Sequence, residues 1–400
     1  MPRRLLVIAL LAPSLCPAQV TGTFSLDKTT FAPGEPVFLS FTLHNSGIEP
    51  VEVHTADPYS FCSGYKIHIT RDGAAPPTCS KNFTGSCLSG AISLAPGASR
   101  TERILLNYQN NSRIDLSTVV SAPGYYTVEA TRGIAFDPQS GKVFTSPDHS
   151  EEHEIFHLRV DDALELSPAA YAPYVQQLDF KDSDIRREAA RILATIAPPT
   201  LEPLLLTFAT SKDYALKQFA PLALSNLSTK ASIAALAQMV VDDKPGSYES
   251  MTAAEGLGKT HDPAWLPILL EASDQHNSMY LHYAADSGGD AAIAPLLTRI
   301  HAPASRSSAI YALGYTGSRA AVPILISLLS TQASPDDETR NATISANAAL
   351  RQLTHLYAEQ GAGTAPISTW HNRWQNWWLA NSQTATIYKP EDCAPDTKLP

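Results

Sequence analysis

Residues 309–314 read Ala-Ile-Tyr-Ala-Leu-Gly, and residues 321–329 read Ala-Val-Pro-Ile-Leu-Ile-Ser-Leu-Leu. Apolar residues recur in both segments at helical spacing. Ala309 stands four residues before Leu313, and Pro323 follows that leucine by ten residues. A small residue lets neighbouring helices approach closely, and a proline in the first turn of a helix removes no useful backbone hydrogen bond. This stretch therefore predicts a pair of packed helices.

The same spacing recurs through residues 162–358, so this part of the chain is an internal repeat. The aligned leucines are Leu193, Leu224, Leu257, Leu313 and Leu350, and the alanines four residues before them are Ala189, Ala220, Ala253, Ala309 and Ala346. A proline follows the first, third and fourth leucine by ten residues, at Pro203, Pro267 and Pro323, while Ala234 takes this place after the second. A further unit around Ala284, Ala285 and Pro295 fits with a small shift.

This repeat resembles the HEAT-like, armadillo-type α-solenoid family. Its clearest copies are residues 309–329 and residues 186–193, which read Arg-Arg-Glu-Ala-Ala-Arg-Ile-Leu. The resemblance covers about half of the chain and implies about five to six stacked helix pairs over residues 162–358. Members of this family mostly supply binding surfaces, so the resemblance implies a protein or peptide partner and no particular reaction. Some members of the family attach bilins or bind a di-iron centre. These repeats contain no His-Glu pair of the kind that binds the iron, and nothing in them identifies a bilin site.

Residues 19–161 have the pattern of an all-β domain. Segments 37–43, 65–70 and 125–130 are rich in β-forming residues and partly alternate, and turn clusters such as Ala32-Pro33-Gly34 separate them. The segment 31–47, FAPGEPVFLSFTLHNSG, resembles the immunoglobulin-like domains of exported bacterial proteins. We therefore expect a multidomain fold, all-β plus all-α, with an immunoglobulin-like sandwich before a HEAT-like solenoid.

The first 18 residues have the pattern of a secretory signal peptide. Arg3 and Arg4 precede an apolar run from Leu5 to Leu11, which is too short to span a bilayer, and small residues surround a cut after Ala18. Leu15 stands before Cys16, where a lipoprotein signal would have a small residue. The pattern predicts a cleaved, secreted or periplasmic protein without stable membrane insertion.

Four cysteines remain after cleavage, and an even number in an exported chain predicts disulfides. They are Cys62, Cys79, Cys87 and Cys393. Cys79 and Cys87 are near enough in sequence to close a local loop, which would leave Cys62 to pair with Cys393. Three connectivities remain open, and the absence of any C-x-x-C pair argues against metal ligation.

The composition excludes several classes of protein. The chain has 400 residues, 44% of them hydrophobic and 17% charged, which excludes a disordered chain and a multispanning membrane protein. The formal net charge is −10, and cleavage of the signal leaves 27 basic and 39 acidic residues, a net charge of −12. Such an acidic chain is not expected to bind nucleic acid by neutralising phosphates.

Residues 359–381 predict a tryptophan-rich helix. Trp370, Trp374, Trp377 and Trp378 share one helical face. We expect this face to cap the last repeat, because the ends of a solenoid need closure. The alternative is an aromatic platform for a sugar or a peptide. Residues 382–400 predict an extended tail.

His153-Glu154-Ile155-Phe156-His157 matches the zinc-peptidase motif H-E-x-x-H. On a helix the two histidines would share a zinc ion and Glu154 would act as general base. However, Phe156, Leu158 and Val160 alternate with polar residues, which predicts a strand, and four strand residues separate the two histidines by about 13 Å. We therefore expect exposed histidines on a strand, and keep a zinc peptidase as an alternative that requires a helix here.

The second helices of HEAT-like units tend to line the concave side of the solenoid. The side chains that fall on or beside these helices and favour interfaces are Arg187, Tyr248, Tyr280, His282, Tyr283, Tyr311 and Tyr315. The sequence thus predicts a non-enzymatic scaffold that binds a protein or peptide partner on this face, with no cofactor and no small-molecule substrate. Envelope carbohydrate binding, through the sandwich or the tryptophan face, is a further alternative.

Overall fold

The computed structural model describes residues 20–56, 64–73, 89–108, 120–137, 142–144, 151–242, 246–275, 277–332, 335–357, 367–390, 392 and 397–399. The chain forms two units, and the main division between them lies between Glu165 and Leu166. The predicted signal peptide and the cysteines Cys62, Cys79, Cys87 and Cys393 lie outside the described residues. In the described part of the chain, no helix has the length and apolar character needed to cross a membrane.

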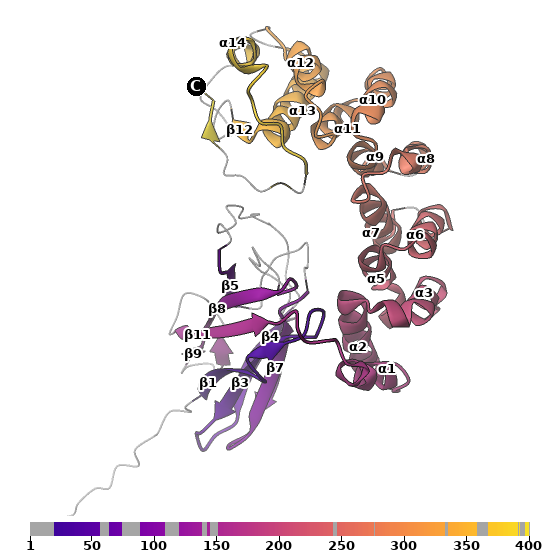
Figure 1. The fold of residues 1–400 in the computed structure, drawn as a ribbon. Coiled ribbons are helices and arrows are strands. Elements are labelled where there is room, and N and C mark those ends of the chain that lie inside the picture. Colours follow the sequence, from indigo (N-terminus) through magenta and orange to yellow (C-terminus); the bar gives the residue numbers. More distant parts are fainter. Residues whose placement is uncertain are drawn as a thin grey trace, which may run out of the picture. The chain divides into compact units, whose positions relative to one another are not determined.

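The first unit consists of strands in three sheets (Figure 1). The strands of the first sheet, in spatial order, are β1 (Val20–Leu26), β3 (Phe38–Asn45) and β7 (Ser99–Leu105). The second sheet has β2 (Thr30–Phe31), β11 (Glu151–Val160), β8 (Gly124–Gly133) and β5 (Tyr65–Arg71). The third has β6 (Ser89–Leu94), β4 (Val51–Ala56), β10 (Lys142–Phe144) and β9 (Ala135–Asp137).

Aromatic rings join the first two sheets in one core. Tyr65 of β5 lies edge-on to Phe24 of β1 and Phe41 of β3, with ring centroids 6.3 and 5.8 Å apart. The Tyr65 hydroxyl donates a 2.7 Å hydrogen bond to Glu102 of β7, and the fully buried Arg132 of β8 pairs with the same carboxylate. A buried charge of this kind is tolerated because it is paired.

The second unit is a row of helix pairs (Figure 1). The first helices of the pairs are α1 (Ala172–Gln177), α3 (Glu202–Thr210), α6 (Lys230–Asp242), α8 (Leu266–Gln275), α10 (Ile293–Ile300) and α12 (Ala321–Ser327). The second helices are α2 (Ser183–Ile196), α5 (Ala220–Leu227), α7 (Tyr248–Gly258), α9 (Tyr280–Gly288), α11 (Arg306–Ala312) and α13 (Asp337–Thr354), with the short α4 (Tyr214–Lys217) before α5. The second helices line the inner side of the curved row, and we call them the inner helices.

The alanines and leucines that repeat in the sequence are the residues through which these helices pack. Every aligned alanine, from Ala189 to Ala346, and every aligned leucine, from Leu193 to Leu350, is fully buried between neighbouring helices. Pro203 and Pro267 each occupy the second position of a helix, where no intrahelical hydrogen bond is lost. The helical-repeat prediction is confirmed.

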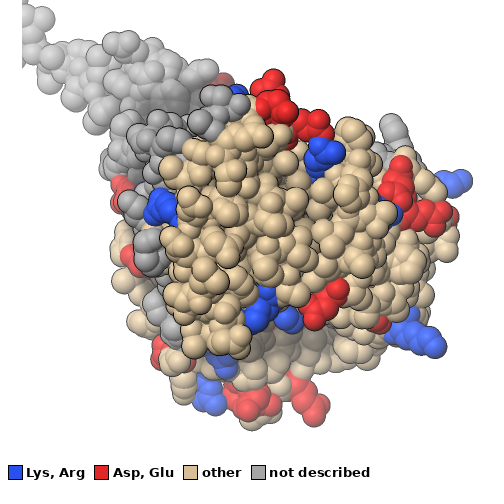
Figure 2. All heavy atoms as spheres, turned by 90° about the horizontal axis from the view of Figure 1, so that it is seen from above, with Lys and Arg blue, Asp and Glu red and all other residues tan. Residues whose placement is uncertain are grey.

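The C-terminal residues close the end of the row. Helix α14 (Ser368–Asn381) buries Trp374 completely, and the Trp374 indole donates a 2.8 Å hydrogen bond to Asn347 of α13. Trp370, Trp377 and Trp378 pack against the same core, so the tryptophan face is turned inward. Figure 2 shows the face of the molecule that is at the top of Figure 1. A broad area of this face carries no Lys, Arg, Asp or Glu side chains, and such side chains lie around its margin.

The chain after α14 returns along the last repeats. Strand β13 (Thr397–Lys398) pairs in parallel with β12 (Leu356–Tyr357), and Leu399 is buried. Those residues of the predicted extended tail that the structure describes thus pack against the helical unit.

Candidate functional site

The H-E-x-x-H segment lies on strand β11, which pairs antiparallel with β8 along its length. The predicted strand is confirmed. His153 Nε2 lies 2.9 Å from Glu129 Oε1, and His157 Nδ1 lies 3.2 Å from Thr127 Oγ1, both across the strand pair. The zinc-peptidase alternative required these two histidines one helical turn apart, and the strand contradicts that arrangement. Among the described residues no group of three or more His, Cys, Asp or Glu side chains is placed to hold a metal ion.

Three of the residues predicted for the partner surface lie apart from the rest. Arg187 on α2 is half-exposed and forms an ion pair of 3.1 Å with Asp184. Tyr248 begins α7 and is 61% exposed. Tyr280 is fully buried, with its hydroxyl 2.8 Å from Ser250 Oγ, so its assignment to a surface that touches a partner is wrong. Its ring instead fills the space between α7 and α9.

The other four residues form one group, which we call the aromatic cluster: His282 and Tyr283 on α9, Tyr311 on α11, and Tyr315 in the short 3-10 turn η5 (Leu313–Tyr315). The His282 ring stacks on Tyr315 with centroids 4.8 Å apart, and meets Tyr311 edge-on at 5.0 Å. Tyr311 and Tyr315 stand four residues apart, and their hydroxyl oxygens are 3.4 Å apart. All four side chains are half-buried. Neighbouring inner helices thus present a packed aromatic surface.

Burial favours the uncharged forms of His282, Tyr283 and Tyr315. It lowers the pKa of His282 to about 4. It also raises the pKa of Tyr283 to about 12, with a smaller contribution from the nearby Glu255 carboxylate. The pKa of Tyr315 is raised for the same reason, with contributions from Tyr311, Tyr283 and Asp286. The cluster therefore offers uncharged ring faces beside carboxylates.

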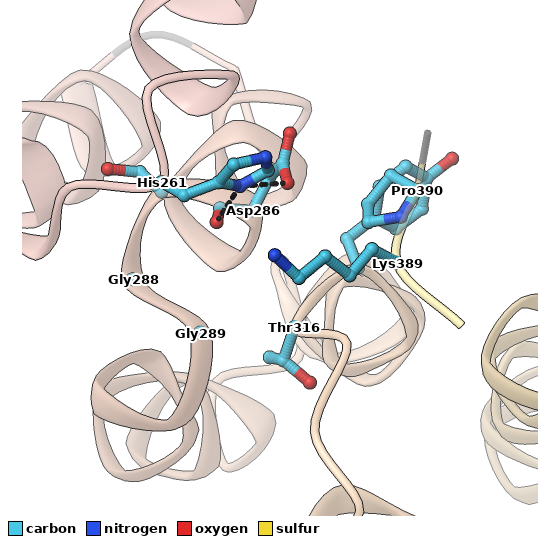
Figure 3. Close-up of a pocket in the computed structure, with 9 residues that line it drawn as sticks. His261, Asp286, Gly288, Gly289, Thr316, Lys389 and Pro390 are labelled. Carbon is cyan, nitrogen blue, oxygen red and sulfur yellow. Dashed lines mark hydrogen bonds and ion pairs between the residues drawn. The ribbon is translucent and has the colours of Figure 1, made fainter. Parts of the chain in front are cut away.

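A hollow of about 190 Å³ adjoins the cluster at Tyr315 (Figure 3). Asp286 at the end of α9 and His261, which follows α7, face each other there. His261 Nδ1 is 3.3 Å from both the side-chain Oδ1 and the backbone oxygen of Asp286. The other lining residues are Ser287, Gly288, Gly289, Tyr315, Thr316, Lys389 and Pro390.

The C-terminal tail supplies one side of this hollow. Arg319 donates hydrogen bonds of 2.5 Å to the backbone oxygens of Ser382 and Ala385, and Tyr388 donates its N–H to Leu353 at 2.8 Å. These bonds fix the chain just before Lys389, whose side chain extends into the hollow toward Gly288 and Asp286 (Figure 3). An imidazole, a carboxylate, an ammonium and a hydroxyl therefore meet in one small space.

The sequence interpretation missed His261, Asp286 and Lys389. A signal for Asp286 was present, because it follows Ala284 by two residues, as Tyr311 follows Ala309. Asp286 thus takes the register position at which the sequence analysis did select Tyr311. Lys389 carried no such signal, since its place depends on contacts with residues more than sixty positions earlier.

Two family models match parts of the chain: HEAT repeats at residues 172–250 and the PBS lyase HEAT-like repeat at residues 305–331. Both matches lie in the helical unit and support a helical-repeat region. No curated protein matches the chain.

Solved structures give only remote likenesses. A β-glucosidase from Listeria innocua in complex with gluconolactone is 14% identical, with a TM-score of 0.19, over 36% of this chain and 16% of that enzyme. A Salmonella alpha-2-macroglobulin variant is 11% identical, with a TM-score of 0.18, over 82% of this chain and 26% of that protein. The chain thus spans about a quarter or less of these proteins, and scores at this level support no inference about its fold or function.

Proposed function

We propose that the protein is an exported, non-enzymatic scaffold that binds an extended segment of a partner protein along its inner helices. The observation that carries the proposal is the aromatic cluster, in which His282, Tyr311 and Tyr315 are in ring contact on adjacent helices. Rigid, half-buried tyrosines give large contact areas at a small entropic cost, and such residues are enriched at the energetic centres of interfaces.

The length of the inner surface suits a peptide. Packed helices lie 8–10 Å apart, so the row from α2 to α13 extends over about 45 Å. An extended chain of about 13 residues covers that distance.

Export and an immunoglobulin-like first unit are parts of the same proposal. The signal-peptide pattern of residues 1–18 supports export, and the shared core of Phe24, Phe41 and Tyr65 supports two facing sheets. Intact-mass measurement of the protein secreted by its host should give a chain that begins at Gln19. A chain that retains residues 1–18 would contradict export by cleavage.

Peptide binding is tested by selection from a random peptide library on the purified chain from Gln19 onward. Selected peptides should bind at least tenfold more weakly to a Tyr311→Ala variant, measured by calorimetry. Tyr125→Ala is the matched control, because Tyr125 is an exposed tyrosine of the β unit, and it should leave the affinity unchanged. Peptides that bind both variants equally, or a library without enrichment, would overturn the proposal.

A further inference from the structure

We propose that the hollow beside the aromatic cluster is a subsite for a basic side chain of the bound peptide, and that Lys389 of the protein's own tail occupies it in the free protein. This inference rests on the proposed function, since it names the chemistry of the peptide. It is carried by three independent features of the hollow: its charge, the helix ends around it, and the lysine already directed into it.

The charges around the hollow favour a cation. Glu255 and Lys259 form an ion pair of 2.7 Å on α7, and their formal charges cancel. Of the residues that line the hollow, Asp286 carries a formal charge of −1 and Lys389 one of +1. A second carboxylate, that of Asp392, accepts the Lys389 backbone N–H at 2.7 Å. The Asp286 side chain is only 12% exposed, so its field is weakly screened by water. An arriving ammonium or guanidinium group would replace the charge of Lys389.

Helix ends add to this field. Helix α9 ends at Gly288, in the wall of the hollow, and His261 follows the C-terminal end of α7. The inner helices run in the same direction, so their C-terminal ends gather at one edge of the row. The C-terminal end of a helix carries a partial negative charge and stabilises cations.

The tail presents a lysine to this edge in a defined way. Its backbone is fixed by Arg319 and Leu353, and the stem of Lys389 lies against Gly317, where an added methyl group would be 2.9 Å from Lys389 Cγ. The ammonium end enters the hollow between Gly288 and Asp286 (Figure 3). A space of about 190 Å³ accommodates the end of one lysine or arginine side chain with a few waters.

The test uses small probes, so that it does not depend on any selected peptide. N-acetyl-lysine amide and its uncharged analogue N-acetyl-norleucine amide are titrated into the chain from Gln19 onward. The binding signal is the NMR chemical shift of the His261 ring. The same titrations are made with a Lys389→Met variant, which keeps an unbranched stem against Gly317 and removes the charge. Lys230→Met is the matched control, because Lys230 is an exposed lysine on α6, which is the first helix of its pair.

We expect the lysine probe to bind Lys389→Met at least fivefold more tightly than wild type or Lys230→Met, and the norleucine probe not to bind. Asp286→Asn combined with Lys389→Met should abolish the gain. Equal or weaker binding of the lysine probe to Lys389→Met would overturn the inference. So would binding of acetate to wild type that is lost in Lys389→Met, because the hollow would then be an anion site with Lys389 as its ligand. Peptide binding that depends on Tyr311 can succeed or fail separately from these results.

Discussion

The backbone of Gly317 and the side chain of Lys389 are in direct contact, although 71 residues separate them in the sequence. Gly317 has a φ of +59°, a conformation that other residues adopt only with strain. The glycine therefore serves two purposes: it makes the turn after η5, and it leaves room for the lysine that enters the hollow.

Gly317→Ala should loosen the tail. The added methyl group pushes against the Lys389 stem, and we expect the Tyr388 N–H, which is bonded to Leu353, to exchange with solvent about tenfold faster. Gly246→Ala is the matched control, because Gly246 has a φ of +71° and nothing within 4 Å of its added methyl group. Both variants should lose about 1 kcal/mol of unfolding free energy from backbone strain. Equal exchange rates at Tyr388 in the two variants would contradict a role for the contact.

Arg186 and Arg187 are adjacent in sequence but should differ in their effect on stability. Arg186 donates hydrogen bonds of 2.7, 2.7 and 2.8 Å to Asp213, Phe180 and Lys181, and so ties α2 to the start of α4. Arg187 has a half-exposed ion pair with Asp184 within its own helix. Arg186→Ala should lower the unfolding free energy of the helical unit by about 2 kcal/mol, and Arg187→Ala by less than about 0.5 kcal/mol. Urea unfolding followed by helical circular dichroism measures both, and similar losses would refute the distinction.

Trp374 should be the critical tryptophan of the C-terminal cap. Trp374→Phe removes the indole N–H and leaves Asn347 Oδ1 without its buried donor, so we expect a loss of about 2 kcal/mol in the unfolding free energy of the helical unit. Trp378 is half-buried, and Trp378→Phe should cost less than about 1 kcal/mol. The same urea experiment checks this order, and a larger loss for Trp378→Phe would show that the cap packs differently.

The sequence predicted those features that repeat locally. The spacing of alanine, leucine and proline identified the helix pairs, because one packing contact recurs in every unit. The alternation of Phe156, Leu158 and Val160 identified β11 and outweighed the zinc motif. The same spacing could also have placed Tyr280 correctly. Tyr280 stands four residues before the buried Ala284, so it belongs to the buried face of its helix and not to the surface.

The hollow could not be predicted in this way. Asp286 and His261 come from different repeat units, and Lys389 comes from a tail without periodicity. Their meeting depends on how the ends of α7 and α9 and the Arg319 hydrogen bonds position the backbone, which no local pattern encodes. Sites made by contacts distant in sequence are for this reason visible only in the folded chain.

The pH dependence of stability should report on His282. Burial holds its folded pKa at about 4, below the ordinary value of 6.5, so the folded state binds fewer protons than the unfolded state between these values. The unfolding free energy of the helical unit should therefore be unaffected by this residue above pH 6.5, and fall as the pH decreases from 6.5 to about 4. The total loss is on the order of 3 kcal/mol.

His282→Phe, which keeps a ring against Tyr315, should flatten this part of the curve of unfolding free energy against pH. His301→Phe, at an exposed histidine, should leave the curve unchanged. Urea unfolding at pH 7.5, 5.5 and 4.5 decides the matter, and an equal acid loss in all three proteins would mean that His282 is not held neutral by burial.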